Sequence, residues 1–254
     1  MKALITGASS GIGKEMAIYL SELVHELILV SNEKEKLEEV RYNLKTKAKI
    51  IVIDLSDEDK VKELYMIAKN ENIDILINNA GFGVCGGYDE VDLQTEIDMI
   101  SVNVKAVHIL TKLFLKDMEK KGFGYILNVS SLAGFLKGGA KMSCYYATKS
   151  YVTSYTLALY QELKNHASRV KVSVLCPGPI KTNFLDRANV KFKLKGLSPR
   201  YVAISAIDGM FKNKTIIIPG FKNKLMYFFS KFVPTKLTLK IISNSQDKDK
   251  KNAL

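Results

Sequence analysis

Cysteine is scarce in this chain of 254 residues. Cys85, Cys144 and Cys176 are far apart and form no C-x-x-C pair. A disulfide framework and a zinc site both depend on paired or closely spaced cysteines, so neither is expected, and a reducing cytoplasm fits best. Cys144 stands beside a tyrosine and is a candidate for redox sensitivity, although small buried cysteines are usually inert.

Histidine is equally rare, and long apolar runs are missing. His25, His108 and His166 lack metal-ligand spacing, so no metal site is expected, and His108 falls in an apolar helical stretch that favours a structural role. No run of about eighteen apolar residues suggests a membrane span. The chain enters an apolar strand at once, which leaves no room for an export signal.

The charge of the chain is unevenly distributed. Residues 1–180 contain 22 basic and 22 acidic residues, whereas residues 181–254 contain 16 basic and 4 acidic residues and so carry the whole net charge of +12. Such an excess favours an anionic partner. Nucleic acid is not the expected partner, because no recognition motif organises the basic residues.

Short β-branched runs alternate with stretches of helical period. The expected strands are residues 3–6, 26–30, 49–54, 73–81, 125–131, 170–179 and 215–220, and helical stretches such as 12–24, 33–44, 57–69 and 101–120 separate them. Strands that are apolar on both faces are typical of a parallel sheet covered by helices on each side. The pattern predicts a single α/β domain.

A glycine-rich turn follows the first expected strand. The stretch TGASSGIG places Gly7, Gly11 and Gly13 where a strand passes into an amphipathic helix. Glycines at such a turn let the backbone approach a pyrophosphate, which then lies over the helix N-terminus. The position indicates a dinucleotide-binding site.

Two adjacent tyrosines precede a lysine in the stretch MSCYYATKSYV. Residues four apart share a helix face, so Tyr145 can meet Lys149 and Tyr146 cannot. A free phenol titrates near about 10, and a nearby ammonium favours its ionised form. Tyr145 is therefore a candidate acid or base, and Tyr146 is expected to be a packing residue.

These motifs resemble the short-chain dehydrogenase/reductase family, and the resemblance extends in order along nearly the whole chain. TGASSGIG is followed by Asp54 after the third strand, NNAG at 78–81, Asn103, NVSSLAG at the end of the fifth strand, Tyr145 with Lys149, and PGPIKT at 177–182. The resemblance implies a Rossmann-type, doubly wound, seven-stranded parallel sheet with a catalytic domain at 1–220. It also implies a homodimer or homotetramer.

The resemblance assigns roles to particular residues. Tyr145 exchanges the proton with the substrate oxygen, Lys149 lowers the phenol's pKa and binds the nicotinamide ribose, Ser131 hydrogen-bonds the substrate oxygen, and Asn103 supports a relay water. The implied cofactor-binding set is Gly7, Ser9, Ser10, Gly11, Ile12, Gly13, Ser31, Asn32, Asp54, Leu55, Asn79, Ala80, Gly81, Tyr145, Lys149, Pro177, Gly178, Ile180 and Thr182.

Two features depart from the family pattern. The loop between Ser131 and Tyr145 is one residue longer than the commonest spacing, so Ser130 is an alternative to Ser131. After the second strand, Ser31 and Asn32 stand where an acid would select NAD, and Lys14 and Lys34 are candidates to attract a 2′-phosphate. The expected cofactor is NADP(H), with NAD(H) as the alternative.

The segment 183–212 is expected to cover the substrate. It mixes apolar with basic residues: Phe184, Leu185, Phe192 and Leu194 with Arg187, Lys191, Lys193 and Lys195. An apolar pocket with a basic rim suits an amphipathic anion, such as an acyl thioester on coenzyme A or acyl carrier protein, or a steroid or bile acid. The alternative is a solvated lid.

Residues 221–254 form a basic amphipathic extension with a polar tail. Pro234 is expected to break it into two pieces, and residues 243–254 are expected to be frayed. The extension could rest on an anionic membrane through residues 221–242, extend the substrate pocket, or lie at a subunit interface.

The expected function is an NADP(H)-preferring oxidoreductase of lipid metabolism that interconverts a ketone and a secondary alcohol, with a 3-oxoacyl thioester favoured as substrate. A hydroxysteroid or bile-acid dehydrogenase is the first alternative. A catalytically idle nucleotide-binding or membrane-docking module is the second, although such proteins often lose the tyrosine or the lysine.

Overall fold

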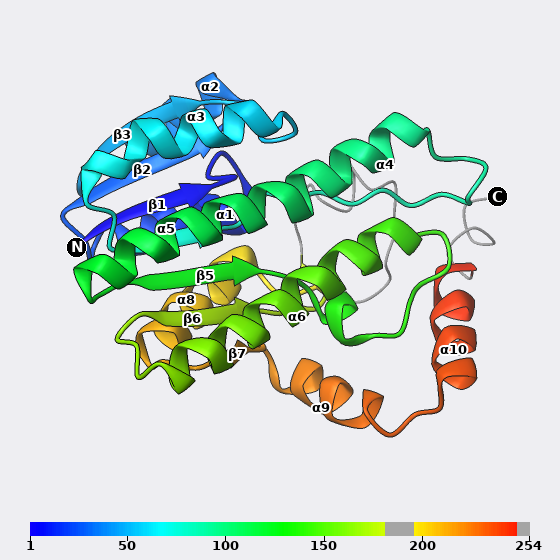
Figure 1. Ribbon diagram of the computed structural model, residues 1–254. Coiled ribbons are helices and arrows are strands. Elements are labelled where there is room, and N and C mark those ends of the chain that lie inside the picture. Colours follow the sequence, from blue (N-terminus) through cyan, green and yellow to red (C-terminus); the bar gives the residue numbers. More distant parts are fainter. Residues whose placement is uncertain (181–195, 248–254) are drawn as a thin grey trace.

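A single parallel sheet forms the centre of the computed structural model, which describes residues 1–180 and 196–247 (Figure 1). Its strands are β1 Lys2–Thr6, β2 Glu26–Ser31, β3 Lys47–Val52, β4 Ile75–Asn78, β5 Tyr125–Val129, β6 Lys171–Leu175 and β7 Ile216–Ile217. They lie in the order β3-β2-β1-β4-β5-β6-β7, and every neighbouring pair is parallel. The predicted α/β class with seven strands is confirmed.

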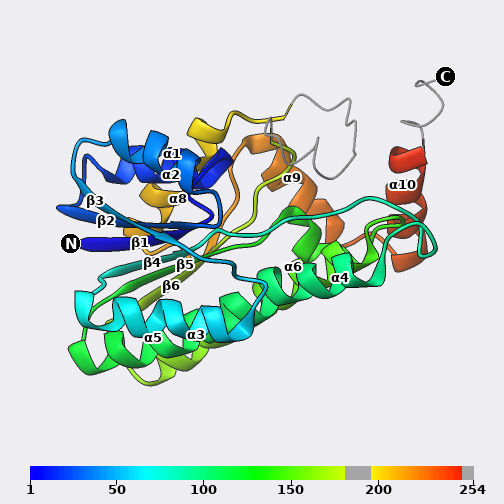
Figure 2. The ribbon, with the colours of Figure 1, turned by 90° about the horizontal axis from the view of Figure 1, so that it is seen from above.

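Helices cover both faces of the sheet (Figure 2). They are α1 Gly11–Leu20, α2 Lys34–Tyr42, α3 Glu58–Ala68, α4 Leu93–Ile100, α5 Val107–Lys121, α6 Ser143–Asn165 and α8 Pro199–Phe211, with short turns η1 Lys69–Glu71, η2 Ser101–Ala106 and η3 Leu132–Phe135. Side chains alternate along each strand, so Ile5 packs beneath α1, α2 and α8, whereas Leu4 packs beneath α3 and α5. The result is the doubly wound arrangement predicted from the sequence.

Two helices were not expected from hydrophobic periodicity. Helix α4 begins after Asp92, whose carboxylate accepts hydrogen bonds from the backbone amides of Gln94 and Thr95 at 2.9 and 3.2 Å. Helix α8 begins after Ser198, which caps the amide of Tyr201, and has a proline in its first turn. Both starts carry ordinary capping signals that periodicity alone does not detect.

The C-terminal extension forms α9 Phe221–Ser230 and α10 Thr235–Asp247, and Pro234 separates them as predicted. The expectation of a frayed tail from residue 243 is wrong for its first part, because α10 continues to Asp247. Nothing between Thr235 and Asp247 breaks a helix, since the stretch contains neither glycine nor proline. Helix α9 packs on η3, with the Tyr227 ring 4.5 Å from that of Phe135.

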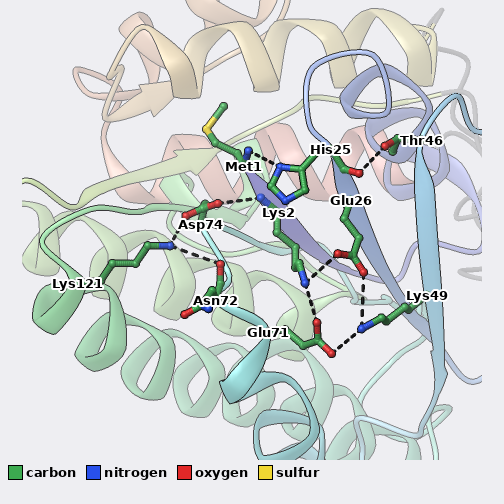
Figure 3. A network of polar contacts seen from close by, with 10 residues as sticks. All are labelled: Met1, Lys2, His25, Glu26, Thr46, Lys49, Glu71, Asn72, Asp74 and Lys121. Carbon is green, nitrogen blue, oxygen red and sulfur yellow. Dashed lines mark hydrogen bonds and ion pairs between the residues drawn. The ribbon is translucent and has the colours of Figure 1, made fainter.

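The amino-terminal edge of the sheet is held by a network of charged residues (Figure 3). The Lys2 ammonium, at the start of β1, lies 2.8 Å from Glu26 and 2.6 Å from Glu71. Lys49 also bridges to Glu71 at 2.6 Å. Because this edge lies opposite the carboxyl ends of the strands, the network can stabilise the sheet without taking part in the site.

Candidate active site

The carboxyl ends of the parallel strands bring together most of the residues singled out in the sequence. Thr6 ends β1, Asn78 ends β4, Val129 ends β5 and Leu175 ends β6. In an open α/β sheet, ligands bind outside these ends, where the strand order reverses. In this chain the reversal falls between β1 and β4, which is where the glycine-rich turn and the NNAG turn meet.

Thr6 ties those two turns together. Its hydroxyl accepts hydrogen bonds from the backbone amides of Asn79 and Ala80, both at 3.0 Å. The Asn79 side-chain amide in turn donates hydrogen bonds to the carbonyl oxygens of Thr6 and Gly7 at 2.9 and 3.0 Å. The sequence analysis did not single out Thr6, although its position as the last residue of β1 was a usable signal.

The glycines of the first turn are required by backbone geometry. Gly7 has φ +64°, and a Cβ there would lie 2.8 Å from the Cα of Ala80. A Cβ at Gly13 would lie 2.2 Å from the carbonyl oxygen of Gly7. Helix α1 starts at Gly11 after Ser10, whose side chain makes no capping hydrogen bond. The backbone amides in the first turn of α1 can therefore donate hydrogen bonds to a pyrophosphate, as a dinucleotide site requires.

An acidic side chain lies at the end of β2, where the sequence analysis expected none. Ser31 donates a hydrogen bond to the Ser9 hydroxyl at 3.0 Å, and Ser9 donates to the Glu33 carboxylate at 2.8 Å. Lys14, expected to attract a 2′-phosphate, is paired with Glu39 at 2.7 Å. The prediction of cofactor choice rests on Ser31 and Asn32 and does not include Glu33, the very next residue.

Asp54 and Leu55 lie beyond the end of β3. Asp54 is exposed, and its carboxylate accepts hydrogen bonds from the amide and hydroxyl of Ser56, both at 2.9 Å. Leu55 is buried in the core beneath α3 and α5. The loop is thereby held in a fixed conformation at the same edge of the sheet.

Lys149 lies inside the site, with 5% of its surface exposed. Its ammonium donates to the carbonyl oxygen of Val129 at 3.1 Å and lies 5.9 Å from the ring centroid of Tyr145. A Cβ at Gly81 would come within 3.2 Å of the same nitrogen. The NNAG turn, β5 and α6 thus meet at one buried cation.

The two candidate serines have different surroundings. The Ser131 hydroxyl hydrogen-bonds Tyr145 and accepts from the amide of Ala133 at 3.1 Å. The Ser130 hydroxyl is buried, donates to the carbonyl oxygen of Lys149 at 2.8 Å and contacts the Thr153 hydroxyl at 2.7 Å. Ser131 therefore faces the phenol, whereas Ser130 joins β5 to α6.

The loop between Ser131 and Tyr145 contains two residues with positive φ. Gly138 has φ +138° and Lys141 has φ +60°, so the backbone turns sharply in this segment before α6 begins. Gly134, by contrast, is required for packing, since a Cβ there would lie 2.3 Å from the Thr153 hydroxyl.

Asn103 lies in η2, a π-helical turn between α4 and α5, and is fully buried. Its side-chain amide donates to the carbonyl oxygen of Phe82 at 2.8 Å and to the Thr148 hydroxyl at 3.1 Å, and its oxygen accepts from the amide of Phe82 at 3.0 Å. π-Helical turns often occur at functional sites. Here the turn lets Asn103 connect the NNAG segment to α6.

Burial dominates the electrostatics of the site. It raises the pKa of Tyr145 to about 12, and the hydrogen bond from Ser131 offsets part of that rise. Burial also lowers the pKa of Lys149 to about 8. The resemblance implies that Lys149 lowers the phenol's pKa, but in the chain alone burial outweighs the other influences on Tyr145 and its pKa is raised.

The PGPIKT segment follows β6. The carbonyl oxygen of Pro177 accepts from the amide of Leu132 at 2.9 Å, and Ile180 pairs with Leu197. Gly178 lies against Asn223 of α9, because a Cβ there would be 2.6 Å from the Asn223 side-chain oxygen. Thr182 and most of the expected substrate-covering segment, including Phe184, Leu185, Arg187, Lys191, Phe192, Lys193, Leu194 and Lys195, lie outside the described residues.

Tyr146 faces away from Lys149, as the helical spacing predicts. Its ring packs on Gly139, where a Cβ would lie 2.3 Å away. It lines a groove of about 630 Å³ between the loop 136–140, α6 and α10, to which Leu239, Lys240 and Ser243 also contribute. The extension thus forms one wall of a largely apolar groove behind the candidate catalytic tyrosine.

The comparisons with known proteins agree with this geometry. A model of the short chain dehydrogenase family matches residues 1–191. The chain belongs to the short-chain dehydrogenase family. It is 33% identical over 189 residues to a 3-oxoacyl-[acyl-carrier-protein] reductase of Rickettsia prowazekii (strain Madrid E), covering 74% of this chain and 76% of that protein.

Two solved structures extend the comparison. A short-chain dehydrogenase from Sphingobium yanoikuyae in complex with NADPH has a TM-score of 0.82 at 26% identity, covering 91% of this chain and 92% of that one. A 7β-hydroxysteroid dehydrogenase has a TM-score of 0.84 over 95% of this chain and 96% of that one, but at 20% identity this likeness shows the fold alone.

The family membership defines the general chemistry. The protein is an oxidoreductase that acts on CH–OH groups with a nicotinamide cofactor. The two turns joined by Thr6 and the uncapped start of α1 fit a dinucleotide. Such a cofactor supplies or accepts the hydride in this reaction.

Proposed function

We propose that this chain reduces the 3-oxo group of an acyl thioester to the corresponding alcohol. The observation that carries the proposal is the group formed by Ser131, Tyr145 and Lys149: a phenol hydrogen-bonded to a serine hydroxyl, with a buried ammonium one helical turn away. The likeness to the 3-oxoacyl-[acyl-carrier-protein] reductase supports the choice of substrate.

Each side chain has a distinct role in this proposal. Tyr145 donates its proton to the ketone oxygen as hydride reaches the carbonyl carbon. Ser131 donates a hydrogen bond to that oxygen, where negative charge develops. Lys149 stabilises the phenolate that remains and binds the nicotinamide ribose. Asn103 is a positioning residue, because its hydrogen bonds to Phe82 and Thr148 hold the segments around the pocket.

We propose NADP(H) as the preferred cofactor. The support comes from Ser31 and Asn32, which stand in place of the usual selecting acid, and from Lys34, which is exposed beside them. Glu33 opposes this preference, because its carboxylate contacts Ser9 and would repel a 2′-phosphate. That contact makes NAD(H) the specific alternative, and the ratio of kcat/KM for the two cofactors decides between them.

The acyl group of the proposed substrate is carried by either coenzyme A or acyl carrier protein. Coenzyme A and acyl carrier protein are both anionic, and the basic residues of the last third of the chain complement either of them. We also propose that the protein works as a homodimer or homotetramer in the cytoplasm, as is common in the family.

A substrate panel tests the proposal. NADPH and NADH oxidation is followed with a long-chain 3-oxoacyl thioester, an oxo-steroid acid and a small ketone, for the unmodified protein, Tyr145→Phe and the matched control Tyr146→Phe. We expect turnover of the thioester, a loss of about 10²–10⁴-fold in kcat for Tyr145→Phe, and little change for Tyr146→Phe. Cofactor binding by each variant, measured by fluorescence, shows that it is folded.

The other outcomes are equally specific. Exclusive turnover of the oxo-steroid acid would replace the acyl substrate by a steroid and leave the catalytic residues in place. Cofactor binding without turnover of any ketone or alcohol would favour an idle sensor. Equal loss of activity in both tyrosine variants would contradict the assignment of Tyr145.

A further inference from the structure

The two C-terminal helices expose apolar side chains to an unusual degree. Phe221, Phe228 and Phe232 are 79%, 54% and 71% exposed, and Leu225, Phe229, Leu237 and Ile241 are also among the exposed large hydrophobic residues. No side chain of α9 is fully buried. Single exposed apolar residues are ordinary, but a contiguous cluster on consecutive helices indicates an interaction surface.

Four exposed apolar residues of α9, together with Phe232 just beyond its end, form one stripe. Positions 221, 225, 228, 229 and 232 recur at the spacing that places residues on a single helix face. The opposite face is half-buried and includes Asn223, which lies against Gly178, and Tyr227, which packs on Phe135. The helix therefore already has a protein-facing side, and its apolar stripe points away from the protein.

Lysines accompany this stripe without any acidic neighbour. Lys222, Lys224 and Lys231 belong to the α9 region, and Lys236 and Lys240 to α10, whereas no Asp or Glu occurs between Asp208 and Asp247. Within the described residues, none of the five forms an ion pair with a carboxylate. Basic residues beside an outward apolar stripe are typical of helices that lie in the interface of an anionic bilayer.

A second copy of this chain is a less suitable partner for this exposed surface of α9 and α10. In a two-fold symmetric contact the same patch would meet itself, so lysines would face lysines with no carboxylate from this segment to pair with them. No helix of the described chain is long and apolar enough to cross a bilayer.

We propose that α9 and α10 dock the protein on an anionic lipid bilayer, with the Phe221–Phe232 stripe in the interfacial region and the lysines at the headgroups. Both helices lie beyond the carboxyl ends of the strands, on the same side as the start of α6 (Figures 1 and 2). Docking would bring the candidate active site close to the membrane. Bulky apolar substrates held in the bilayer would then have a short path to the catalytic residues.

Vesicle flotation with the full chain tests this proposal. The probes are vesicles of phosphatidylcholine alone and of phosphatidylcholine mixed with phosphatidylglycerol, at low and high ionic strength. We expect binding to the anionic vesicles that weakens as salt is added, and little binding to the neutral ones. The double variant Lys222→Gln/Lys236→Gln is expected to lower the partition coefficient about 30-fold. Phe228→Ser/Phe232→Ser is expected to lower it at least about tenfold.

Matched controls come from the opposite part of the molecule. Met66→Ser/Ile67→Ser removes apolar side chains of similar exposure, 55% and 50%, from α3, and Lys116→Gln/Lys120→Gln removes two exposed charges from α5. Both controls are expected to bind anionic vesicles as the unmodified protein does. Turnover of a soluble ketone is expected to be unchanged in all four variants, which separates docking from catalysis.

Three results would overturn the proposal. The first is no binding to either kind of vesicle, and the second is binding that the control variants weaken as much as the α9 and α10 variants. The third combines two observations: the unmodified protein does not bind vesicles, and Phe228→Ser/Phe232→Ser elutes as a smaller assembly than the unmodified protein in size-exclusion chromatography. That result would identify a second copy of the chain as the partner of this surface.

Discussion

The hydroxyl of Ser9, in the glycine-rich turn, donates a hydrogen bond to the carboxylate of Glu33, 2.8 Å away at the start of α2. This contact places a negative charge beside the turn that fits the cofactor. Ser31, which contacts Ser9 at 3.0 Å, continues the chain of hydroxyl groups back to β2. We therefore expect this carboxylate, one position beyond Ser31 and Asn32, to influence the choice between NAD(H) and NADP(H).

Replacing Glu33 by glutamine is expected to favour NADP(H). The substitution keeps an acceptor for Ser9 and removes the charge that would repel a 2′-phosphate. We expect the ratio of kcat/KM for NADPH to that for NADH to rise about tenfold, which corresponds to about 1.4 kcal/mol. Glu35→Gln is the charge-matched control, because Glu35 is exposed on the same helix. An equal rise in both variants would point to a general field effect and contradict a specific role for Glu33.

The two serines after β5 are expected to differ when each is replaced by alanine. Ser131→Ala removes the donor that faces Tyr145, so kcat is expected to fall about 10²–10³-fold with little change in stability. Ser130→Ala removes one hydrogen-bond partner from each of two buried groups of α6, the Lys149 carbonyl oxygen and the Thr153 hydroxyl, which keep their bond to each other. It is therefore expected to lower the free energy of unfolding by about 0.5–1.5 kcal/mol. Steady-state kinetics and urea unfolding of both variants measure these effects, and the reverse pattern would make Ser130 the catalytic serine.

Much of the fold could be predicted from local patterns. Apolar runs such as Leu27–Val30 are buried on both faces of the sheet, and the Tyr145 to Lys149 spacing places both side chains on one helix face. These features depend on residues that are near in sequence. Helix α4 was missed although its signals are also local: the capping residue Asp92 is followed by Leu93, Ile97 and Ile100 at helical spacing.

The remaining features of the site depend on contacts between distant segments. Thr6 joins turns that are more than seventy residues apart, Asn103 reaches Thr148 across forty-five residues, and Gly178 meets Asn223 of the extension. No local pattern specifies such pairs. The net rise in the pKa of Tyr145 could not be predicted for the same reason, since burial depends on the assembled pocket.

Ketone reduction is expected to lose rate above about pH 8. Burial lowers the pKa of Lys149 to about 8, so its ammonium, which the proposed mechanism needs, is present below that pH and is lost above it. The logarithm of kcat/KM is therefore expected to be flat below pH 8 and to decline above it. Lys149→Arg, whose guanidinium stays charged, is expected to be slow but to lack this decline. The same decline in both proteins would assign it to another group.

The charged network at the opposite edge of the sheet is expected to contribute to stability without affecting catalysis. The hydrogen bonds from Lys2 and Lys49 hold the pKa of Glu71 below its ordinary value. A carboxylate with a lowered pKa in the folded state stabilises the fold above its unfolded pKa, and this contribution is lost as the pH falls through the folded value.

Glu71→Gln is accordingly expected to lower the free energy of unfolding by up to about 1 kcal/mol at pH 7, a modest value because the pair is partly exposed. The difference from the unmodified protein should shrink as the pH falls below about 4, because the carboxylate is protonated first in the unfolded chain and then, at its lower pKa, in the folded protein. Glu63→Gln, which removes an exposed partner of Lys60, is the control and is expected to change little. Urea unfolding at several pH values measures all three proteins. A difference between Glu71→Gln and the unmodified protein that stays constant down to pH 3 would mean that packing of the side chain, and not its charge, holds this edge of the sheet together.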